Sequence, residues 1–238
     1  MKALVTGGSG LIGSAICEAL ASEGLHVLVH ANQNLDRARQ VVEKIRSAGQ
    51  SAETACFDVS DRKATSHHLE NILESGPVQV LVNNAGIYDD ATMAGMLPEQ
   101  WDRVIQITLN GFFNVTHPLL LPMIRSRWGR IISISSITGV AGNRGQTNYA
   151  AAKSGLHGAS KSLSKEVASR GITVNVVAPG IIQSSSTDEH FSDTDVKNLI
   201  PMKRRGTPQE IADVVVFLAS EKASYITGQI LNVNGGIC

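Results

Sequence analysis

Short apolar runs alternate with longer amphipathic segments along the whole chain. The apolar runs are rich in residues that favour buried strands, and they lie at residues 3–5, 25–30, 51–57, 78–82, 129–135, 173–178 and 229–233. Helical patterns separate them, near residues 12–23, 35–48, 61–75, 98–126, 147–169 and 208–219. Strands that alternate with helices form right-handed βαβ units, which place helices on both faces of a parallel sheet. The pattern therefore predicts an α/β fold with a doubly wound parallel β-sheet.

The alternation continues without a break, so we expect residues 1–238 to form a single domain. No linker-like stretch, low-complexity segment or repeat of fixed period interrupts it. The longest irregular piece runs from Gly180 to Lys203 and is polar and rich in serine. A long loop just after the carboxyl end of a strand more often covers a ligand than merely connects two elements. We therefore expect residues 180–205 to form a lid over the substrate.

The charged residues are balanced, with 21 lysines and arginines against 21 aspartates and glutamates. No overall field therefore draws the protein to nucleic acid or to a membrane, and no apolar run approaches the about 18 residues that indicate a membrane span. The amino terminus enters a strand directly and lacks the features of a signal peptide. Cys17, Cys56 and Cys238 are widely separated and lack metal-ligand spacing. We expect unpaired thiols in a reducing cytoplasm, with no metal site and no nucleic-acid or membrane partner.

A glycine-rich turn, Thr-Gly-Gly-Ser-Gly-Leu-Ile-Gly at residues 6–13, follows the first predicted strand and opens the first helix. Glycines at such a turn allow a close approach to a pyrophosphate, which the amino end of the helix then holds. This arrangement predicts a dinucleotide site in a Rossmann-like fold. The residues of the turn that we expect at the cofactor are Gly7, Ser9, Gly10, Leu11 and Ile12.

Two further segments lie just past predicted strands. Asp58 follows the third strand, and the run Asn83-Asn84-Ala85-Gly86 follows the fourth. Ligands of open sheets bind at the carboxyl ends of the strands, so we expect both segments at the same cleft. For Asp58 a second interpretation is equally good, since its carboxylate could cap the helix that comes next.

A tyrosine and a lysine at helical spacing form the second candidate site. Tyr149 and Lys153 are four residues apart in an alanine-rich segment, so they share one face of a helix. A neighbouring ammonium favours the phenolate, so we expect the pKa of Tyr149 to be lowered from its usual value of about 10. Such a pair can protonate an alkoxide as it forms, and the hydroxyl of Ser136 could bond the same oxygen. Taken alone, this spacing more often serves only the solubility of a helix.

Together these motifs resemble the short-chain dehydrogenase/reductase family over the whole chain. Residues 142–149, 169–175 and 233–236 are most similar to the 3-oxoacyl-acyl-carrier-protein reductases of that family. The resemblance implies that Tyr149 is the general acid/base, that Ser136 donates to the substrate oxygen, and that Lys153 tunes Tyr149 and holds the nicotinamide ribose. It further implies cofactor contacts, including an adenine contact at Asp58 and a carboxamide contact at Ile182. The remaining expected contacts are Asn32, Val59, Asn84, Ala85, Gly86, Pro179, Gly180 and Ser184.

The chain departs from the family pattern at two places. Leu11 stands where single-domain members usually have the middle glycine of the turn, and the glycine spacing is instead similar to that of the extended branch. Thr108 stands where the family has a fourth catalytic residue, an asparagine that is thought to hold water on a proton path to the lysine. Asn110 is about 200° further around a helix, so it should not substitute. We expect a weaker or rerouted proton supply rather than loss of activity.

The residues after the second predicted strand bear on cofactor choice. Ala31 stands where NAD-specific relatives carry an aspartate, so nothing there repels a 2′-phosphate. Asn32 and Gly10 also replace arginines that would bind this phosphate, which leaves Asn32, Gln33 and Arg37. We expect NADP(H) to be favoured over NAD(H), with a modest preference.

The resemblance also implies an acidic partner. Arg127 and Arg170 match the positions at which the acyl-carrier reductases dock the carrier protein, and family precedent implies a homotetramer. The expected activity is the NADPH-dependent reduction of a 3-oxoacyl thioester to the 3-hydroxyacyl thioester, in fatty acid or in polyketide or polyene biosynthesis. One alternative is an oxidoreductase for a free small alcohol, ketone or sugar. The other is a dinucleotide-binding protein with little catalysis.

Overall fold

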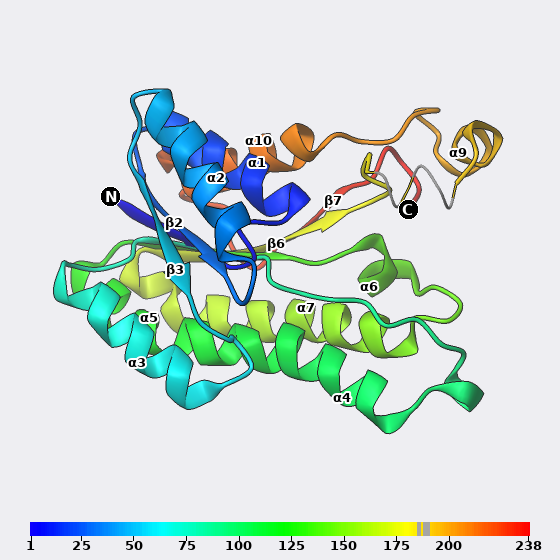
Figure 1. The fold of residues 1–238 in the computed structure, drawn as a ribbon, viewed down its shortest axis with the longest axis horizontal. Coiled ribbons are helices and arrows are strands. Elements are labelled where there is room, and N and C mark those ends of the chain that lie inside the picture. The colour runs from blue at the N-terminus through cyan, green and yellow to red at the C-terminus, as the bar shows by residue number, and fades with distance from the viewer. Residues whose placement is uncertain (185–186, 188–190) are drawn as a thin grey trace.

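The structure is a computed structural model that describes residues 1–184, 187 and 191–238 (Figure 1). Within these residues, seven parallel strands form one sheet in the order β3-β2-β1-β4-β5-β6-β7. The strands are β1 (Lys2–Val5), β2 (His26–Ala31), β3 (Ala52–Cys56), β4 (Val80–Asn83), β5 (Gly129–Ile134), β6 (Ile172–Pro179) and β7 (Ile230–Val233). The strand order reverses between β1 and β4, and such a switch point opens a crevice at the carboxyl ends of the strands.

Helices cover both faces of the sheet (Figure 1). One layer holds α1 (Leu11–Ser22), α2 (Leu35–Ser47) and α10 (Pro208–Ala219). The opposite layer holds α3 (Arg62–Glu74), α4 (Pro98–Ile105), α5 (Gly111–Ser126) and α7 (Thr147–Val167). Two short helices, α6 (Ile137–Ala141) and α9 (Asp193–Leu199), lie on the side to which β6 and β7 point.

The buried side chains of the strands alternate between two cores. Val5 in β1 packs in one core with Ile16 of α1 and Val215 of α10. Leu4, its neighbour in β1, packs in the other with Leu119 of α5. Successive side chains of a strand point to opposite faces, so a strand that is apolar at every position needs helices on both faces. This is why the sequence shows continuous apolar runs.

The predicted fold class is confirmed, and each predicted strand and helix is present with small shifts of its ends. The expected helix over residues 98–126 is wrong in one respect, because a π-helical turn at Gln106–Asn110 separates α4 from α5. The segment 180–203 is not irregular throughout, since it contains α9, and α6 was not expected. Residues 185–186 and 188–190 of the expected lid lie outside the described residues, and its role as a lid stays a prediction. No described helix is long and apolar enough to cross a membrane.

Candidate active site

A cleft of about 810 Å³ opens at the carboxyl ends of the strands. It is bordered by the turns after β1, β4 and β6, and by α6 and α7. The structure brings together in its lining most of the residues expected from the sequence: Gly7, Ser9, Gly10, Leu11, Ile12, Asn84, Ala85, Gly86, Ser136, Tyr149, Lys153, Pro179, Gly180, Ile182 and Ser184. Asn32, Asp58 and Val59 are not part of this lining.

The glycine-rich turn is packed too closely for side chains at two of its positions. Gly7 has a positive φ of 62°, a conformation that L-residues with side chains rarely adopt. A Cβ at Gly13 would lie 2.2 Å from the carbonyl oxygen of Gly7. Asn84 Nδ2 reaches across from β4 and donates to the carbonyl oxygens of Thr6 (2.9 Å) and Gly7 (3.0 Å). These contacts fix the turn against the strand beside it.

The amino end of α1 is open toward the cleft. Gly10 is the N-cap residue, no described side chain caps this end, and its first turn has no acidic residue. Uncapped backbone N–H groups and the helix dipole favour an anion. Leu11, the first helical residue, is half exposed at 50% and lines the cleft. The unusual leucine therefore leaves the glycine-rich cradle intact, and the turn fits a pyrophosphate.

Asp58 lies beyond the end of β3 and is held by its neighbours. Its Oδ1 accepts hydrogen bonds from the Ser60 backbone N–H (2.8 Å) and hydroxyl (2.7 Å). Burial opposes ionisation of Asp58, but the hydrogen bonds from Ser60 and Asn32 outweigh it and lower the pKa of this carboxyl. The cap of α3 is Asp61, which accepts from the N–H groups of residues 63 and 64. The interpretation of Asp58 as the helix cap is therefore wrong.

Val59 lies deeper, with its side chain buried. Its carbonyl oxygen accepts from Asn114 Nδ2 on α5 at 2.9 Å. This contact ties the segment after β3 to the layer of helices below the sheet.

Three side chains meet at the centre of the cleft, one from the turn between β5 and α6 and two from α7. Ser136 follows β5 and is the N-cap of α6, where its Oγ accepts from the N–H of Thr138 at 3.1 Å. Ser136 also forms a side-chain hydrogen bond with Tyr149 of α7. Lys153, one turn further along α7, donates from Nζ to the carbonyl oxygen of Ile134 at 2.8 Å. Its Nζ lies 5.6 Å from the centre of the Tyr149 ring.

Burial has the largest effect on the pKa values of Lys153 and Tyr149. It lowers the pKa of Lys153 to about 8, because a buried ammonium loses its hydration. It also raises the pKa of Tyr149; the hydrogen bond from Ser136 opposes the rise, and Asp90 and Tyr88 add to it. The expectation that Lys153 lowers the pKa of Tyr149 is therefore wrong for this structure. The phenol keeps its proton at neutral pH, which suits a proton donor.

Thr108 faces the same group from the π-helical turn. A Cβ at Gly86 would lie 3.1 Å from Lys153 Nζ and 3.4 Å from Thr108 Oγ1, so both atoms border one spot. Thr108 is only 3% exposed, and its Oγ1 has no hydrogen-bond partner among the described residues. It lines a small cavity of about 10 Å³, a volume close to that of one water molecule. Asn110 is exposed and donates to Gln106 Oε1 at 2.6 Å instead.

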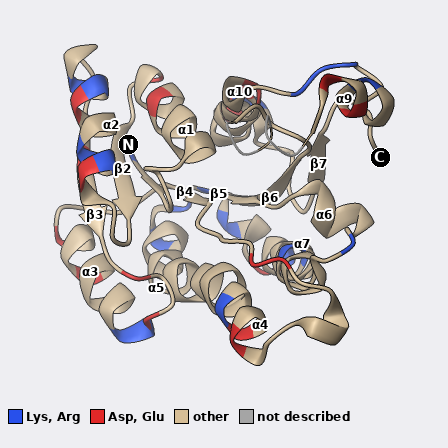
Figure 2. Cartoon of the chain, turned by 45° about the vertical axis from the view of Figure 1, so that its right-hand side comes forward, with Lys and Arg blue, Asp and Glu red and all other residues tan. Residues whose placement is uncertain are grey.

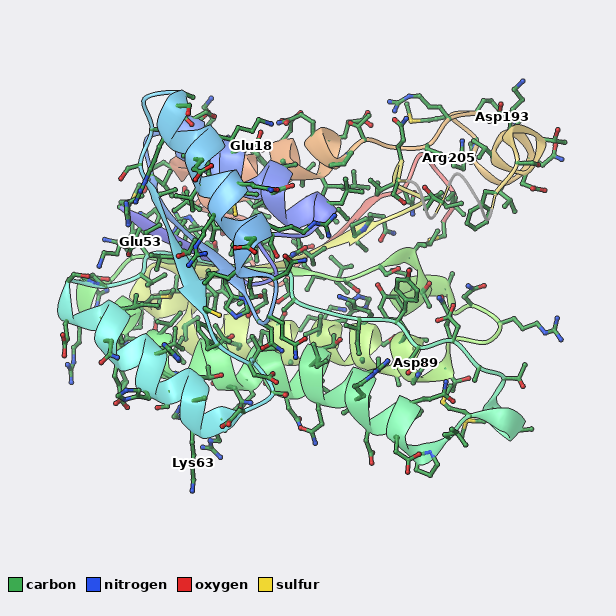
Figure 3. All side chains as sticks on the ribbon, in the orientation of Figure 1. Glu18, Glu53, Lys63, Asp89, Asp193 and Arg205 are labelled. Atoms are coloured by element: carbon green, nitrogen blue, oxygen red, sulfur yellow. The ribbon has the colours of Figure 1, made fainter. Side chains whose placement is uncertain are left out.

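A set of hydrogen bonds made by Asn148 holds the amino end of α7, and this role was not expected from the sequence. Asn148 is fully buried, and its Oδ1 accepts from the N–H of Tyr149 at 2.8 Å. Its Nδ2 donates to the carbonyl oxygens of Asp89 (2.9 Å) and Gln100 (3.1 Å). The Asp89 carboxylate pairs in turn with Arg103 at 2.7 Å (Asp89 is labelled in Figure 3). In the sequence, the signal for these hydrogen bonds is the asparagine directly before the tyrosine.

Thr187 forms hydrogen bonds with the segment that follows β6. Its Oγ1 donates to the carbonyl oxygen of Ile182 at 2.9 Å and accepts from the N–H of Ser184, also at 2.9 Å. Further along, Arg205 pairs with Asp193 of α9 at 3.5 Å (Figure 3). Figure 2 shows that the segment between α9 and α10 carries a run of basic residues, Lys203 to Arg205.

The two arginines expected to dock a carrier protein lie far from the cleft. Arg127 precedes β5 and Arg170 precedes β6, so both lie at the amino ends of these strands. They are close together, since Arg127 Nη2 donates to the carbonyl oxygen of Ser169 at 3.2 Å. The cleft is at the carboxyl ends, so within one chain the arginines and the cleft lie at opposite ends of the strands.

Comparison with known proteins accounts for this arrangement. Residues 1–195 match the family model for the short chain dehydrogenase. The 3-oxoacyl-[acyl-carrier-protein] reductase FabG of Aggregatibacter actinomycetemcomitans is 44% identical over 99% of this chain and 98% of its own length. Nodulation protein G of Azospirillum brasilense is also 44% identical, over 99% of this chain and 97% of its own length. FabG of Staphylococcus epidermidis shares 44% identity over 99% of this chain and 98% of its own. With this match, the strand order and the cleft at the strand ends, the chain belongs to the short-chain dehydrogenase family.

Proposed function

We propose that the protein reduces a 3-oxoacyl thioester carried on acyl carrier protein to the 3-hydroxyacyl thioester. The observation that carries the proposal is the group of Ser136, Tyr149 and Lys153, which make hydrogen bonds and line the cleft beside the glycine-rich turn. Relatives that match the chain over nearly its whole length are named for this activity. The pathway is fatty acid synthesis or the synthesis of a polyketide or polyene.

A nicotinamide dinucleotide is the cofactor that this family implies, and the chain's residues fit it. Gly7 has a positive φ that disfavours a side chain, Gly13 has no room for one, and the uncapped end of α1 favours the pyrophosphate. When bound, the dinucleotide supplies the hydride for the ketone carbon. In this proposal Lys153 holds the nicotinamide ribose, and Ile182 and Ser184 hold the carboxamide end.

Tyr149 is the proton donor in this proposal. Its raised pKa keeps the phenol protonated at neutral pH, so it can protonate the ketone oxygen as negative charge develops there. Ser136 hydrogen-bonds the same oxygen and stabilises that charge. Lys153, with a pKa of about 8, can give a proton back toward the tyrosine. Thr108 could hold a water molecule beside Lys153 and so connect the group to solvent.

NADPH is the favoured form of the cofactor in this proposal. Ala31 is buried at the end of β2, and the next three residues are exposed and carry no carboxylate. Asn32 bonds Asp58, which leaves Gln33 and Arg37 nearest to a 2′-phosphate. We expect a modest preference for NADPH. A value of kcat/KM at least tenfold higher for NADH, which is about 1.4 kcal/mol in favour of NADH, would contradict it.

Carrier docking at Arg127 and Arg170 requires contact with a second copy of the chain or a long reach around the sheet, because these residues lie opposite the cleft. A homotetramer, as the family implies, could bring the arginines of one copy to the cleft of another. The exposed apolar residues Phe113 and Leu121 of α5 support such contacts between copies. The mass of the protein in solution, measured by sedimentation, tests the tetramer.

The docking proposal is tested by reversing both charges. Arg127→Glu with Arg170→Glu should raise the KM for the carrier-bound substrate strongly and leave a small, uncharged ketone nearly unaffected, because charges at a rim act on association. Activity on carrier-bound substrate should also fall as salt shortens the Debye length below about 8 Å. The matched control reverses two exposed charges on α2 and α3, Arg39→Glu with Lys63→Glu. Equal losses on both substrates would show that no carrier docks at these arginines.

A reductase for a free small ketone is the second candidate, and the distance of the two arginines from the cleft favours it. Comparing kcat/KM for one 3-oxoacyl group on carrier protein, on coenzyme A and as a small ketone decides between them. We expect the carrier-bound form to be preferred. Preference for the small ketone would overturn the carrier proposal, and no turnover of any form would indicate a dinucleotide-binding protein with little catalysis. The unpaired cysteines fit the cytoplasm, which we propose as the compartment.

A further inference from the structure

A buried histidine connects two turns at the dinucleotide end of the cleft. His30, near the carboxyl end of β2, is only 2% exposed. Its Nδ1 accepts from the N–H of Gly7 at 3.0 Å, and its Nε2 lies 2.8 Å from the carbonyl oxygen of Phe57. The partners fix the tautomer, because a backbone N–H can only donate and a carbonyl oxygen can only accept. His30 is therefore neutral, with its proton on Nε2.

We propose that His30 is a positioning residue for the cofactor, which holds the glycine-rich turn in register with the segment that carries Asp58. The inference rests on the proposed function only in taking the ligand to be a dinucleotide. In this role His30 touches neither the substrate nor the reacting atoms. It acts through Gly7 on one side and through Phe57 on the other.

The Gly7 peptide is held from two directions. His30 receives its N–H, while Asn84 Nδ2 donates to its carbonyl oxygen at 3.0 Å. That carbonyl oxygen lies against Gly13, with no room for even a methyl group between them. A shift of Gly7 would therefore move the start of α1, where the pyrophosphate would bind. Without His30, the Gly7 N–H would lose the only hydrogen bond it makes among the described residues.

The other end of His30 fixes the segment after β3. Phe57, whose carbonyl oxygen it bonds, immediately precedes Asp58. The Phe57 ring packs against the imidazole with the ring centres 4.2 Å apart, and His68 of α3 stacks on Phe57 with the ring centres 5.6 Å apart. One side chain thus joins the ends of β1, β2 and β3, which together would hold the pyrophosphate and the adenosine.

The charges around His30 leave this tautomer intact. Burial lowers its pKa to about 4, while the bond to Phe57 and the nearby Asp58 oppose that shift and His68 adds to it. A protonated imidazole would point a second N–H at the N–H of Gly7, so protonation would break the contact that positions the turn.

Two amide variants separate the two hydrogen bonds. In His30→Asn the amide oxygen can take the place of Nδ1 and accept from Gly7, whereas in His30→Gln the longer amide can reach Phe57 but leaves the Gly7 N–H without a partner. A hydrogen bond of this kind is worth about 0.5–1.5 kcal/mol, so a turn that has lost it and must be ordered again when the cofactor binds can lose up to about tenfold in affinity. We therefore expect the Gln variant to raise the Kd for NADPH about tenfold and the Asn variant to change it by less than about threefold. The KM for the ketone should stay near that of the wild type in both.

Hydrogen exchange of the protein without cofactor provides a readout that does not depend on the ligand. Residues 6–13 should exchange faster in the Gln variant than in the Asn variant or the wild type. Equal affinities and equal exchange in the two variants would overturn the role of His30. If the wild type bound no dinucleotide, the proposed function would fail, but the exchange result would still decide whether His30 positions the turn.

Discussion

The two halves of the cleft are built in different ways. At the glycine-rich turn the close contacts involve backbone atoms: Gly13 touches the Gly7 carbonyl, and Asn84 and His30 bond the Gly7 peptide. At α6 and α7 the important contacts are made by polar side chains: half-buried Tyr149 bonds Ser136, and buried Lys153 donates to the carbonyl oxygen of Ile134.

Because of this difference, we expect one half of the cleft to determine cofactor binding and the other half to determine the rate of reaction. The first half has few ionisable groups and holds its ligand by fit, so changes there should alter cofactor affinity and stability. The second half is buried enough to shift the pKa values of Tyr149 and Lys153, so changes there should alter turnover.

The largest effect is expected for the phenol. Tyr149→Phe should lower kcat by roughly 10²–10⁴-fold, because it removes the general acid. The Kd for NADPH, measured by titration, should stay unchanged, since the phenol bonds Ser136 and the substrate rather than the cofactor. Tyr225→Phe is the matched control, because Tyr225 is 99% exposed and should show normal turnover. Near-normal turnover of Tyr149→Phe would show that Tyr149 is not the general acid and that this half of the cleft does not catalyse the reaction.

The next effect is a dependence of stability on pH in the other half. The folded-state pKa of His30 is lowered to about 4, against about 6.5 in an unfolded chain. Between these values the unfolded chain binds a proton that the folded protein does not, so the free energy of unfolding should fall as pH drops from 6.5 to 4. This loss should reach about 3 kcal/mol near pH 4, and none of it should occur above pH 6.5.

Urea unfolding of the wild type and His30→Asn at pH 7 and pH 4.5 measures how much of this loss of stability is due to His30. The Asn variant should lose less stability on acidification, and the exposed His67→Asn should behave as the wild type. Parallel pH curves for His30→Asn and the wild type would show that His30 is not held neutral by the fold.

Steric fit is tested at Gly13. Gly13→Ala places a methyl group 2.2 Å from the Gly7 carbonyl oxygen, and such overpacking typically costs about 1–3 kcal/mol. Thermal melting and NADPH titration should show lower stability and weaker binding. Gly158→Ala on α7 is the control and should raise stability, because no described residue has an atom within 4 Å of the added Cβ and alanine favours a helix by about 0.5–1 kcal/mol over glycine. If both variants bound NADPH equally well, close packing would not determine affinity.

The smallest effect is expected at Thr108. If this residue limits the proton supply, Thr108→Asn should keep or raise kcat with little change in KM. Thr108→Val, which keeps the shape and removes the hydroxyl, should lower kcat by less than Tyr149→Phe does. Steady-state kinetics compare the two. Loss of activity in Thr108→Asn would show instead that the π-helical turn is built around threonine.

Sequence patterns predicted the fold well because they are set by local and repeated constraints. The strands have to be apolar on both faces, as Leu4 and Val5 show, and the cleft follows from the rule that strand ends meet at one edge. The spacing of Tyr149 and Lys153 on one helix is equally local. Their places in the cleft therefore follow from position along the chain.

Features that depend on packing across the fold escaped prediction. The direction of the Tyr149 pKa shift depends on burial, which no local spacing gives. The contact of His30 with Gly7 joins two strands, and one extra residue in the turn of α4 into α5 places Thr108. For α9 a signal was present, since Ser192 and Asp195 form its capping box.

The product formed from a 3-oxoacyl carrier protein shows whether the protein has the proposed reductase activity. Purified protein with NADPH should convert the acyl group so that its mass rises by two hydrogens, with one NADPH consumed for each acyl group, and Tyr149→Phe should convert almost none in the same time. An unchanged acyl mass in the presence of wild-type protein that binds NADPH would contradict the proposed reductase activity.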